Sequence, residues 1–239
     1  MNYYYNNNYL SEDLRKRYAI YENETKEGDI AIYPLPKEVV KESYLEVKEL
    51  QDFISNNRNI KRLILLSHHD VYGNKTRIPN HEEFKPDTIN TNSETHFFCE
   101  WIAQNRCKKY RIELVILRLF SVYGHINDKS VVAKFIEAKE NKTKPIIYGS
   151  GNNTRDFINI KDVIDIIDYF VKNEAKYNGD VINVGTGIET SILDLAEMFG
   201  LEYDNLAGKK DEIERSCADI TKLKFIGIEP KIKIKDYGK

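Results

Sequence analysis

The amino-acid sequence predicts an α/β fold built on a doubly wound, Rossmann-like parallel sheet. Short, unbroken apolar runs recur along the chain, as expected of parallel strands that are buried on both faces. Longer segments with helical spacing of apolar residues lie between them, and this alternation is typical of parallel α/β sheets. With 239 residues, 41% of them hydrophobic and 31% charged, the chain can form one large domain or one and a half ordinary ones.

Each element can be assigned in chain order. The expected strands are the apolar runs at residues 29–33, 62–66, 113–117, 145–148 and 180–184. The expected helices show helical apolar spacing or a capping serine, and they cover residues 39–56, 93–110, 130–141, 161–173 and 191–199. Ser93 and Ser191 are expected to cap the helices that they begin. Residues 204–214 are polar and are expected to form a surface loop.

Residues 1–28 form an atypical N-terminal segment. The segment contains the polar run Asn6-Asn7-Asn8, and residues 13–18 suit one short helix. It shows no basic start followed by an apolar stretch, so we expect no secretory signal.

Composition excludes several classes of protein. The formal charge of -2 argues against a nucleic-acid binder, which normally shows a basic face. No run approaches the ~20 apolar residues of a membrane span, so no membrane partner is expected. Three cysteines, Cys99, Cys107 and Cys217, show no CxxC spacing and do not suit a disulfide framework or a zinc ribbon. A reducing, cytoplasmic setting is expected.

Five segments carry motifs in a characteristic order, and these are Leu63–Gly73, Leu117–Gly124, Tyr148–Phe157 followed by Asp162, Asn183–Gly187, and Ala218-Asp219 with Lys222. Together they resemble the extended short-chain dehydrogenase/reductase family, whose members are NAD-dependent nucleotide-sugar epimerases and dehydratases. The resemblance implies a Rossmann-like portion over residues 29–125 and a mixed, substrate-binding portion over residues 126–239. Within the latter, residues 160–190 are expected to return to the main sheet.

The first departure from the family concerns the cofactor half-site. The family binds NAD on a glycine-rich turn between the first strand and the first helix. Only Gly28 precedes Gly73 here, and residues 1–28 lack the length, the apolar strands and the glycines of a βαβ unit, which needs ~30 residues. We therefore expect the first βαβ unit to be missing and no cofactor to be bound. Gly185-Thr-Gly187 lacks a third glycine, because position 190 is Thr, and predicts a tight turn.

The second departure concerns the catalytic residues. The resemblance puts His68 at the family's Ser/Thr position, and it puts Asn92 and His96 at the Tyr and Lys positions of Tyr-x-x-x-Lys. Asparagine cannot exchange a proton near neutral pH, so the family's general acid/base is lost. No catalytic residue of the family is therefore expected to be intact, and the sequence favours a protein without oxidoreductase activity.

The substrate side matches the family better. Arg155 stands at the position of an arginine that contacts the substrate diphosphate, and a planar guanidinium suits that geometry. The resemblance gives further substrate-binding roles to Ser121, Ile147, Tyr148, Lys209 and Glu212. The structural alternative is that Arg155 and Asp156 only tie a turn to the helix that begins near Lys161.

The histidines allow two interpretations. His68 and His96 are expected to lie close together, with Asn92 and Asp70 nearby. Such a group could bind zinc or form a new acid/base pair. The alternative, which we favour, is drift at a site whose function is gone, and no metal is predicted.

The helices at 39–56 and 93–110 correspond to those that form the family's dimer interface, and Phe97, Phe98 and Trp101 supply bulky apolar surface. The sequence thus predicts a degenerate family member that binds a nucleotide or nucleotide-sugar, or acts as a regulatory subunit, as a homodimer or with a full-length relative. The alternatives are an active NAD-dependent enzyme whose site a partner chain or atypical residues complete, and a scaffold without a small ligand.

Overall fold

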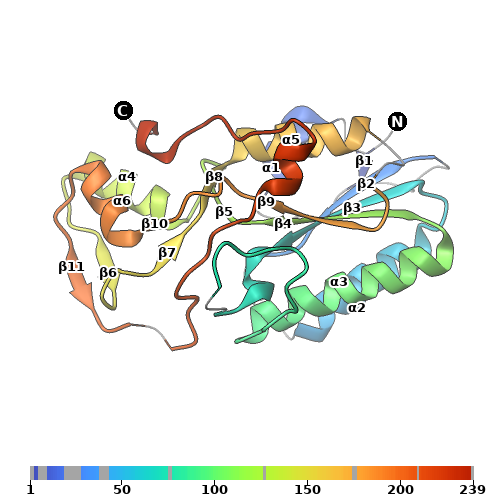
Figure 1. The fold of residues 1–239 in the computed structure, drawn as a ribbon, viewed down its shortest axis with the longest axis horizontal. Helices are drawn as coiled ribbons and strands as arrows, with labels where there is room; N and C mark the ends of the chain where they lie inside the picture. Colours follow the sequence, from blue (N-terminus) through green and yellow to red (C-terminus); the bar gives the residue numbers. More distant parts are fainter. Residues whose placement is uncertain are drawn as a thin grey trace.

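The computed structural model describes residues 3–4, 10–18, 28–37, 43–74, 77–125, 128–173, 177–208 and 210–237. The chain forms a larger lobe around a parallel sheet and a smaller lobe beyond one end of that sheet (Figure 1). In the part of the chain that is described, no helix is long and apolar enough to cross a membrane.

Five parallel strands form the main sheet, in the order β1-β2-β3-β4-β9, and they span Tyr3–Tyr4, Ile30–Pro34, Arg62–His68, Glu113–Leu119 and Asp180–Val184. Alternate residues of β2 point to opposite faces, with Ile30 and Ile32 in one core and Ala31 and Tyr33 in another. This burial on both faces explains the unbroken apolar runs, and the predicted α/β fold class is confirmed.

Helices cover both faces of the main sheet. On one face lie α2 (Ser43–Asn56) and α3 (Thr91–Tyr110), and on the other lie α1 (Ser11–Arg17) and α5 (Ile160–Lys172) (Figure 1). The short α7 (Thr221–Phe225) adds Leu223 to the core on the side of α5. All three cysteines are buried and free.

The N-terminal segment departs from expectation. No strand was expected from residues 1–28, yet Tyr3 and Tyr4 form β1, which pairs in parallel with β2. The following α1 is held to α5, because Arg17 donates from Nε to Asp168 Oδ2 at 2.7 Å and the Tyr18 hydroxyl donates to the same carboxylate. A two-residue strand bonds through its backbone and has no apolar period, so the sequence pattern could not reveal it.

The smaller lobe contains three two-stranded sheets and two helices. The parallel pairs are β5–β8 and β6–β11, the antiparallel pair is β7–β10, and the helices are α4 and α6. Their bounds are Ser121–Tyr123 for β5, Phe157–Asn159 for β8, Ile146–Tyr148 for β6, Asp204–Leu206 for β11, Thr154–Arg155 for β7, Thr190–Ser191 for β10, Val131–Asn141 for α4 and Ile192–Phe199 for α6. The expectation of a loop over 204–214 is wrong at its start, because the exposed strand β11 pairs with β6 through backbone bonds that polar residues can also make.

The carboxyl ends of β3 and β4 face the junction of the two lobes. The 3₁₀ turn η1 (His69–Tyr72) follows β3 there, and a small core of Val71, Tyr72, Phe120 and Ala218 fills the junction. A second 3₁₀ turn, η2 (Ile234–Asp236), packs on the smaller lobe. Ligands of open α/β sheets bind outside the carboxyl ends of the strands, so this junction is the candidate site.

Candidate functional site

The end of β3 delivers three polar side chains in succession to the junction. His68 is the last residue of the strand, and His69 and Asp70 begin η1. Gly73 ends this turn with φ of 61°, and a Cβ there would lie 1.7 Å from the carbonyl oxygen of Asp87. Only glycine fits, so the turn that aims the histidines depends on Gly73.

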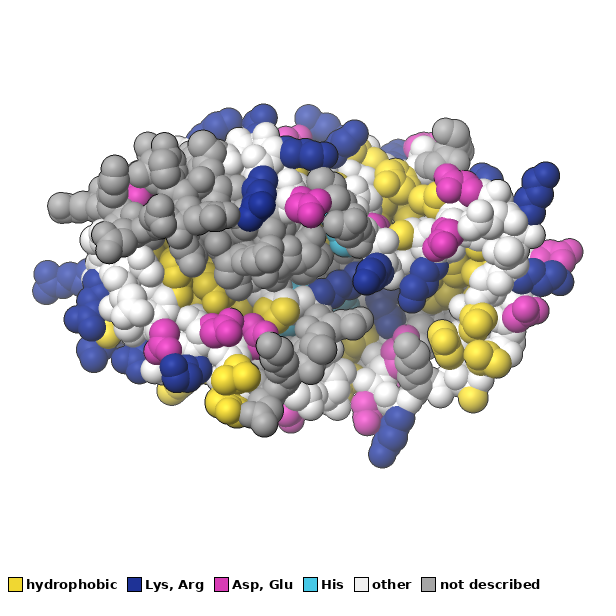
Figure 2. All heavy atoms as spheres, turned by 180° about the vertical axis from the view of Figure 1, so that it is seen from behind, with side chains coloured by type: hydrophobic (Ala, Val, Ile, Leu, Met, Phe, Trp, Pro, Cys, Tyr) yellow, Lys and Arg dark blue, Asp and Glu magenta, His cyan; other side chains and the backbone are white. Residues whose placement is uncertain are grey.

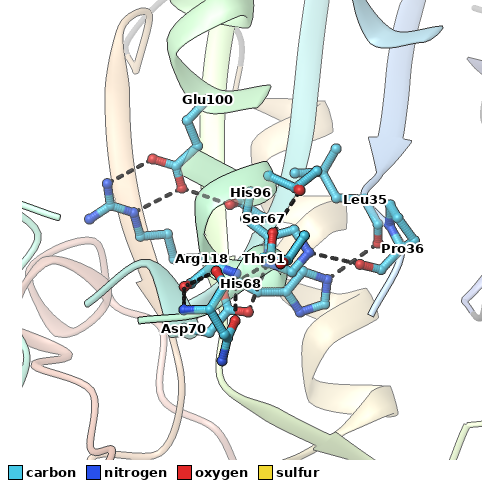
Figure 3. A network of polar contacts seen from close by, with 12 residues as sticks. Leu35, Pro36, Ser67, His68, Asp70, Thr91, His96, Glu100 and Arg118 are labelled. Carbon is cyan, nitrogen blue, oxygen red and sulfur yellow. Dashed lines mark hydrogen bonds and ion pairs between the residues drawn. The ribbon is translucent and has the colours of Figure 1, made fainter. Parts of the chain in front are cut away.

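His68, His96 and Asp70 form one cluster (Figure 3). The two imidazole rings stack with their centroids 4.4 Å apart. Nδ1 of His96 lies 2.7 and 2.9 Å from the two carboxylate oxygens of Asp70, and its Nε2 lies 2.8 Å from the carbonyl oxygen of Pro36. His68 Nε2 lies 3.2 Å from the carbonyl oxygen of Leu35. The expectation that these three side chains lie close together is confirmed by the structure.

The surroundings of the cluster shift the pKa values of all three groups. Burial alone would lower the pKa of His96, but the Asp70 carboxylate and the Pro36 carbonyl outweigh it and raise that pKa above its usual value. Burial works against the Asp70 carboxylate, yet the neighbouring His96 lowers its pKa overall. Burial, followed by the charge of His96, lowers the pKa of His68 to about 3. An ion pair of His96 and Asp70 therefore lies against a neutral His68.

In this arrangement both ring nitrogens of His96 are occupied by hydrogen bonds within the protein. Both carbonyl and carboxylate oxygens are acceptors, so the imidazolium donates from both nitrogens. It ties α3 to the end of β2 and to η1. Stacked rings also cannot direct their lone pairs at one ion, and no group of three or more His, Cys, Asp or Glu among the described residues could hold a metal.

The N-cap of α3 fixes where this helix begins and thereby the position of His96 along it. Asn90 caps this helix by accepting from the backbone N–H of Ser93 at 3.0 Å, and Ser93 Oγ accepts from the backbone N–H of Asn90 at 3.2 Å. The expectation that Ser93 itself is the cap is wrong, because Ser93 is the third helical residue of a capping box. Asn92 lies in the first turn of α3, one turn before His96 on the same side.

Sequence reasoning missed a buried polar network behind the cluster. Arg118 of β4 donates to both carboxylate oxygens of Glu100 at 3.0 and 2.7 Å, and Ser67 donates to the same carboxylate at 2.6 Å. The Tyr72 hydroxyl donates to Asn183 Oδ1 at 2.7 Å. The available signal was the presence of Arg118 and Glu100 inside otherwise apolar segments, since buried charges are almost always paired.

On the smaller lobe, the structure brings together Arg155 and Glu212, two residues to which the family resemblance gives substrate-binding roles. The Arg155 guanidinium lies 3.3 Å from Glu212 Oε1 and donates to the Thr154 carbonyl at 2.8 Å. Burial lowers the pKa of Arg155. Asn74, just beyond η1, donates to the Glu212 carbonyl at 3.1 Å and accepts from the Glu214 N–H at 2.7 Å. These bonds join the segment around Glu212 to the end of η1. Lys209 lies outside the described residues.

Asp156 has a structural role, but it anchors the Gly185-Thr-Gly187 turn and Ala218 and not the helix that begins near Lys161. Its carboxylate accepts from Thr186 N and Oγ1, Gly187 N and Ala218 N, at 2.6 to 3.1 Å. A Cβ on Gly185 would lie 2.6 Å from Asp156 Oδ2, so Gly185-Thr-Gly187 forms a tight turn around this carboxylate. The partly exposed Arg155 contacts Glu212 and takes no part in the hydrogen bonds of Asp156.

The remaining predicted substrate residues differ in exposure. Ser121 is half-buried at the start of β5, and Tyr148 is 42% exposed on β6. Ile147 is 1% exposed and packs in the core of the smaller lobe, so its side chain is not available to a ligand. The predicted role of Ile147 is therefore limited to its backbone, whose carbonyl accepts from Asn205 at 3.1 Å.

A Rossmann-like lobe joined to a smaller lobe, with the candidate site where they meet, is the architecture of sugar-nucleotide epimerases and dehydratases. Residues 35–185 match the family model "NAD dependent epimerase/dehydratase family", and the chain belongs to that family.

Three known proteins illustrate the likeness. The dTDP-D-glucose 4,6-dehydratase of Homo sapiens is 28% identical over 144 residues, which cover 60% of this chain and 41% of that protein. The structure of the UDP-N-acetylglucosamine 4-epimerase of Methanobrevibacter ruminantium, in complex with UDP-N-acetylmuramic acid, matches with a TM-score of 0.69 at 26% identity. The matched region is 86% of this chain and 72% of the epimerase chain. A UDP-glucuronic acid 4-epimerase variant of Bacillus cereus, in complex with UDP-4-deoxy-4-fluoro-glucuronic acid and NAD, has a TM-score of 0.79 at 23% identity. The matched region is 88% of this chain and 73% of the chain of that variant. The chain spans about half the length of the curated relatives it matches, at 56%, 41% and 44% for three of them.

Proposed function

We propose that this protein binds a nucleotide or nucleotide-sugar between its two lobes and does not carry out the hydride transfer of its family. The observation that carries the proposal is the state of His96. Its two nitrogens are spent on Asp70 and on the Pro36 carbonyl, so it cannot replace the lysine that activates a catalytic tyrosine. Asn92, one turn earlier, has no ionisable proton.

The residues present do not fit the family's cofactor, NAD. His68 and His96 bond the carbonyl oxygens of Leu35 and Pro36 at the carboxyl end of β2, on the side of the sheet where the fold binds dinucleotides. Residues 5–9, which connect β1 to α1, contain no glycine. A pyrophosphate needs close approach of a glycine-rich backbone at that connection. We derive no reaction step through NAD.

The substrate side supports ligand binding. The Arg155 side chain is 15% exposed, and among the described residues its one carboxylate partner is Glu212, at the long distance of 3.3 Å. A guanidinium held in this way keeps donors for a second, anionic partner. The names of the relatives indicate UDP- and dTDP-linked sugars, and a nucleoside diphosphate group is what such ligands share.

Calorimetry with UDP-, dTDP- and GDP-sugars and with NAD tests the proposal. We expect at least one nucleotide-sugar to bind and NAD to leave no signal. Arg155→Gln should weaken binding about 10- to 100-fold, as loss of a charge-assisted bond does. Arg58→Gln removes an exposed arginine that lies over the Tyr110 ring and should change nothing. Epimerase or dehydratase turnover with added NAD would contradict the proposal and favour the active-enzyme alternative.

Self-association is part of the same proposal. Tyr44 of α2 and Phe98 and Trp101 of α3 are 60%, 52% and 53% exposed on the outer surface of the larger lobe. Large aromatic side chains are enriched in protein interfaces. We propose that these helices pair with a second copy or with a full-length relative.

A further inference from the structure

One segment of the chain, residues 211–216, joins the two lobes at the candidate site, and we call it the strap. Figure 1 shows the chain between β11 and α7, which includes the strap, running from the smaller lobe to the larger one. The strap pairs with β7, because the Thr154 N–H donates to the Glu214 carbonyl at 2.9 Å and the Ser216 N–H donates to the Thr154 carbonyl at 3.2 Å. The strap therefore lies beside Arg155, the second residue of β7.

Two asparagine side chains of the larger lobe hold the strap from the opposite side. Asn74 donates to the Glu212 carbonyl at 3.1 Å and accepts from the Glu214 N–H at 2.7 Å. Asn90 donates from Nδ2 to the Asp211 carbonyl at 3.2 Å, while its Oδ1 caps α3. All three bonds end on the backbone of the strap, and we call them the latch.

The two ends of the strap are held differently. Just beyond its C-terminal end, the buried Ala218 N–H donates to the Asp156 carboxylate at 3.1 Å. Two of the three latch bonds are instead exposed to solvent, and Asp211 has a left-handed φ of 56°. Apart from Ile213, the strap has no apolar side chain. Local opening begins where hydrogen bonds are exposed and buried apolar contacts are few, so the strap opens most easily at the latch.

The latch limits how far the junction can open, because it joins the larger lobe to a segment that is paired with the smaller lobe. Figure 2 shows histidine atoms deep in the middle of the face seen from behind, beside lysine and arginine side chains. The interior of the junction is therefore reached from solvent on this face. When the latch bonds break, the strap stays paired with β7 and no longer ties the two lobes together.

We propose that Asn74 and Asn90 are positioning residues whose latch sets how fast a nucleotide-sugar enters and leaves the junction. This inference rests on the proposed nucleotide-sugar binding. The two amides act through the strap and not through the ligand. Because the latch forms both with and without ligand, it cancels from the affinity and acts on the two rates.

The first test is surface plasmon resonance of the immobilised full chain with UDP-, dTDP- and GDP-glucose. Asn90→Ser keeps an N-cap, since serine caps about as well as asparagine, and removes the donor to the Asp211 carbonyl. Asn74→Ser removes the other two latch bonds without adding a charge. In each variant we expect association and dissociation both to become about five- to tenfold faster, the factor for about one hydrogen bond, with Kd changed by less than about threefold.

Asn173→Ser is the matched control. The Asn173 amide also donates to a backbone carbonyl, that of Tyr169, at 2.9 Å. The Asn173 carbonyl accepts from Arg62, the first residue of β3, so Asn173 lies at the end of the sheet opposite the junction. This variant should leave both rates unchanged.

The second test is hydrogen exchange of the full chain without ligand. In Asn90→Ser the Glu214 N–H keeps its own acceptor, Asn74, so faster exchange there reports opening of the whole strap. We expect about fivefold faster exchange at Glu214 in this variant, no change at Ala218, and no change at either position in Asn173→Ser.

The outcomes separate this inference from the function on which it rests. Faster exchange at Glu214 together with faster association and dissociation supports the latch. Unchanged rates in both Asn74→Ser and Asn90→Ser overturn it, whatever the exchange shows. Weaker binding at an unchanged association rate also overturns it, because the amides then shape only the bound site. In both cases the proposed function stands. If no nucleotide-sugar binds to the wild-type protein, the proposed function falls, and the role of the latch in ligand entry falls with it.

Discussion

At the scale of residues, the pKa of His68 is lowered and the pKa of His96 is raised, although the two rings are in contact. The folded pKa of His68 is about 3 and its unfolded value is 6.5, so between these values the unfolded chain binds more protons. Stability therefore falls as the pH drops from 6.5 toward 3. His96 has a raised folded pKa, so its contribution is complete below 6.5 and is lost as the pH rises through the folded pKa. The pair places maximal stability near pH 6.5.

This prediction is checked by urea unfolding at a series of pH values. His68→Phe should flatten the acid limb by up to ~1.4 kcal/mol per pH unit, which is one proton's worth, because the ring stack is kept and the titrating group is removed. His96→Gln should instead flatten the alkaline limb. A wild-type protein whose stability rises steadily from pH 4 to pH 9 would show that the two rings do not hold these protonation states.

The side chains of this cluster could be predicted from the sequence, and their bonding partners could not. The family resemblance, with its motifs aligned on Gly73 and Glu100, implied that His68 and His96 are neighbours, with Asp70 nearby. The acceptors of both rings are backbone carbonyls of Leu35 and Pro36, 33 and 60 residues away in the chain. Every residue has a backbone carbonyl, so the residue types do not reveal which carbonyls accept these bonds. For this reason the sequence allowed an acid/base pair, whereas the structure shows both nitrogens of His96 bonded to acceptors.

At the scale of elements, the turn η1 depends on one glycine. Gly73 and Gly227 both have positive φ, at 61° and 79°, so alanine is strained at either position. A Cβ at Gly227 meets nothing within 4 Å, whereas a Cβ at Gly73 would overlap the Asp87 carbonyl. Gly227→Ala should cost ~1 kcal/mol of unfolding free energy, and Gly73→Ala ~3 kcal/mol or more. Chemical denaturation of both variants checks this, and equal losses would show that η1 adapts without the glycine.

Element types were predictable where burial imposes a period, and element limits were not. The strands of the main sheet and the helices between them follow from two-faced burial. The exposed β11 and the two-residue β1 are held by backbone pairing with β6 and β2, which makes no demand on side-chain polarity. The start of α3 was misjudged because Asn90 and Ser93 both suit a cap, and only the reciprocal bonds of the capping box decide between them.

At the scale of the whole molecule, the sheet is covered unequally. Helices α2 and α3 cover one face and carry exposed aromatic side chains on their outer side, while α1, α5 and α7 cover the other. The unbroken apolar runs predicted the parallel sheet, and the order of the family motifs predicted a substrate-binding portion over residues 126–239. The proposed contact with a second copy depends on surface residues that no motif fixes.

The last prediction concerns this outer surface. If α2 and α3 form a self-complementary interface, Phe98 and Trp101 lie near its centre, where buried aromatic side chains contribute most to affinity. Trp101→Glu would bury an unpaired charge there and should convert a dimer into a monomer in sedimentation equilibrium. Phe225→Glu is the matched control, because Phe225 is 88% exposed on α7, across the sheet, and the same charge there should leave the dimer intact. A wild-type protein that sediments as a monomer up to about 100 μM, a concentration at which a specific interface of ordinary strength is largely occupied, would remove the interface from these helices. A dimer that both variants leave unchanged would place the interface elsewhere on the surface.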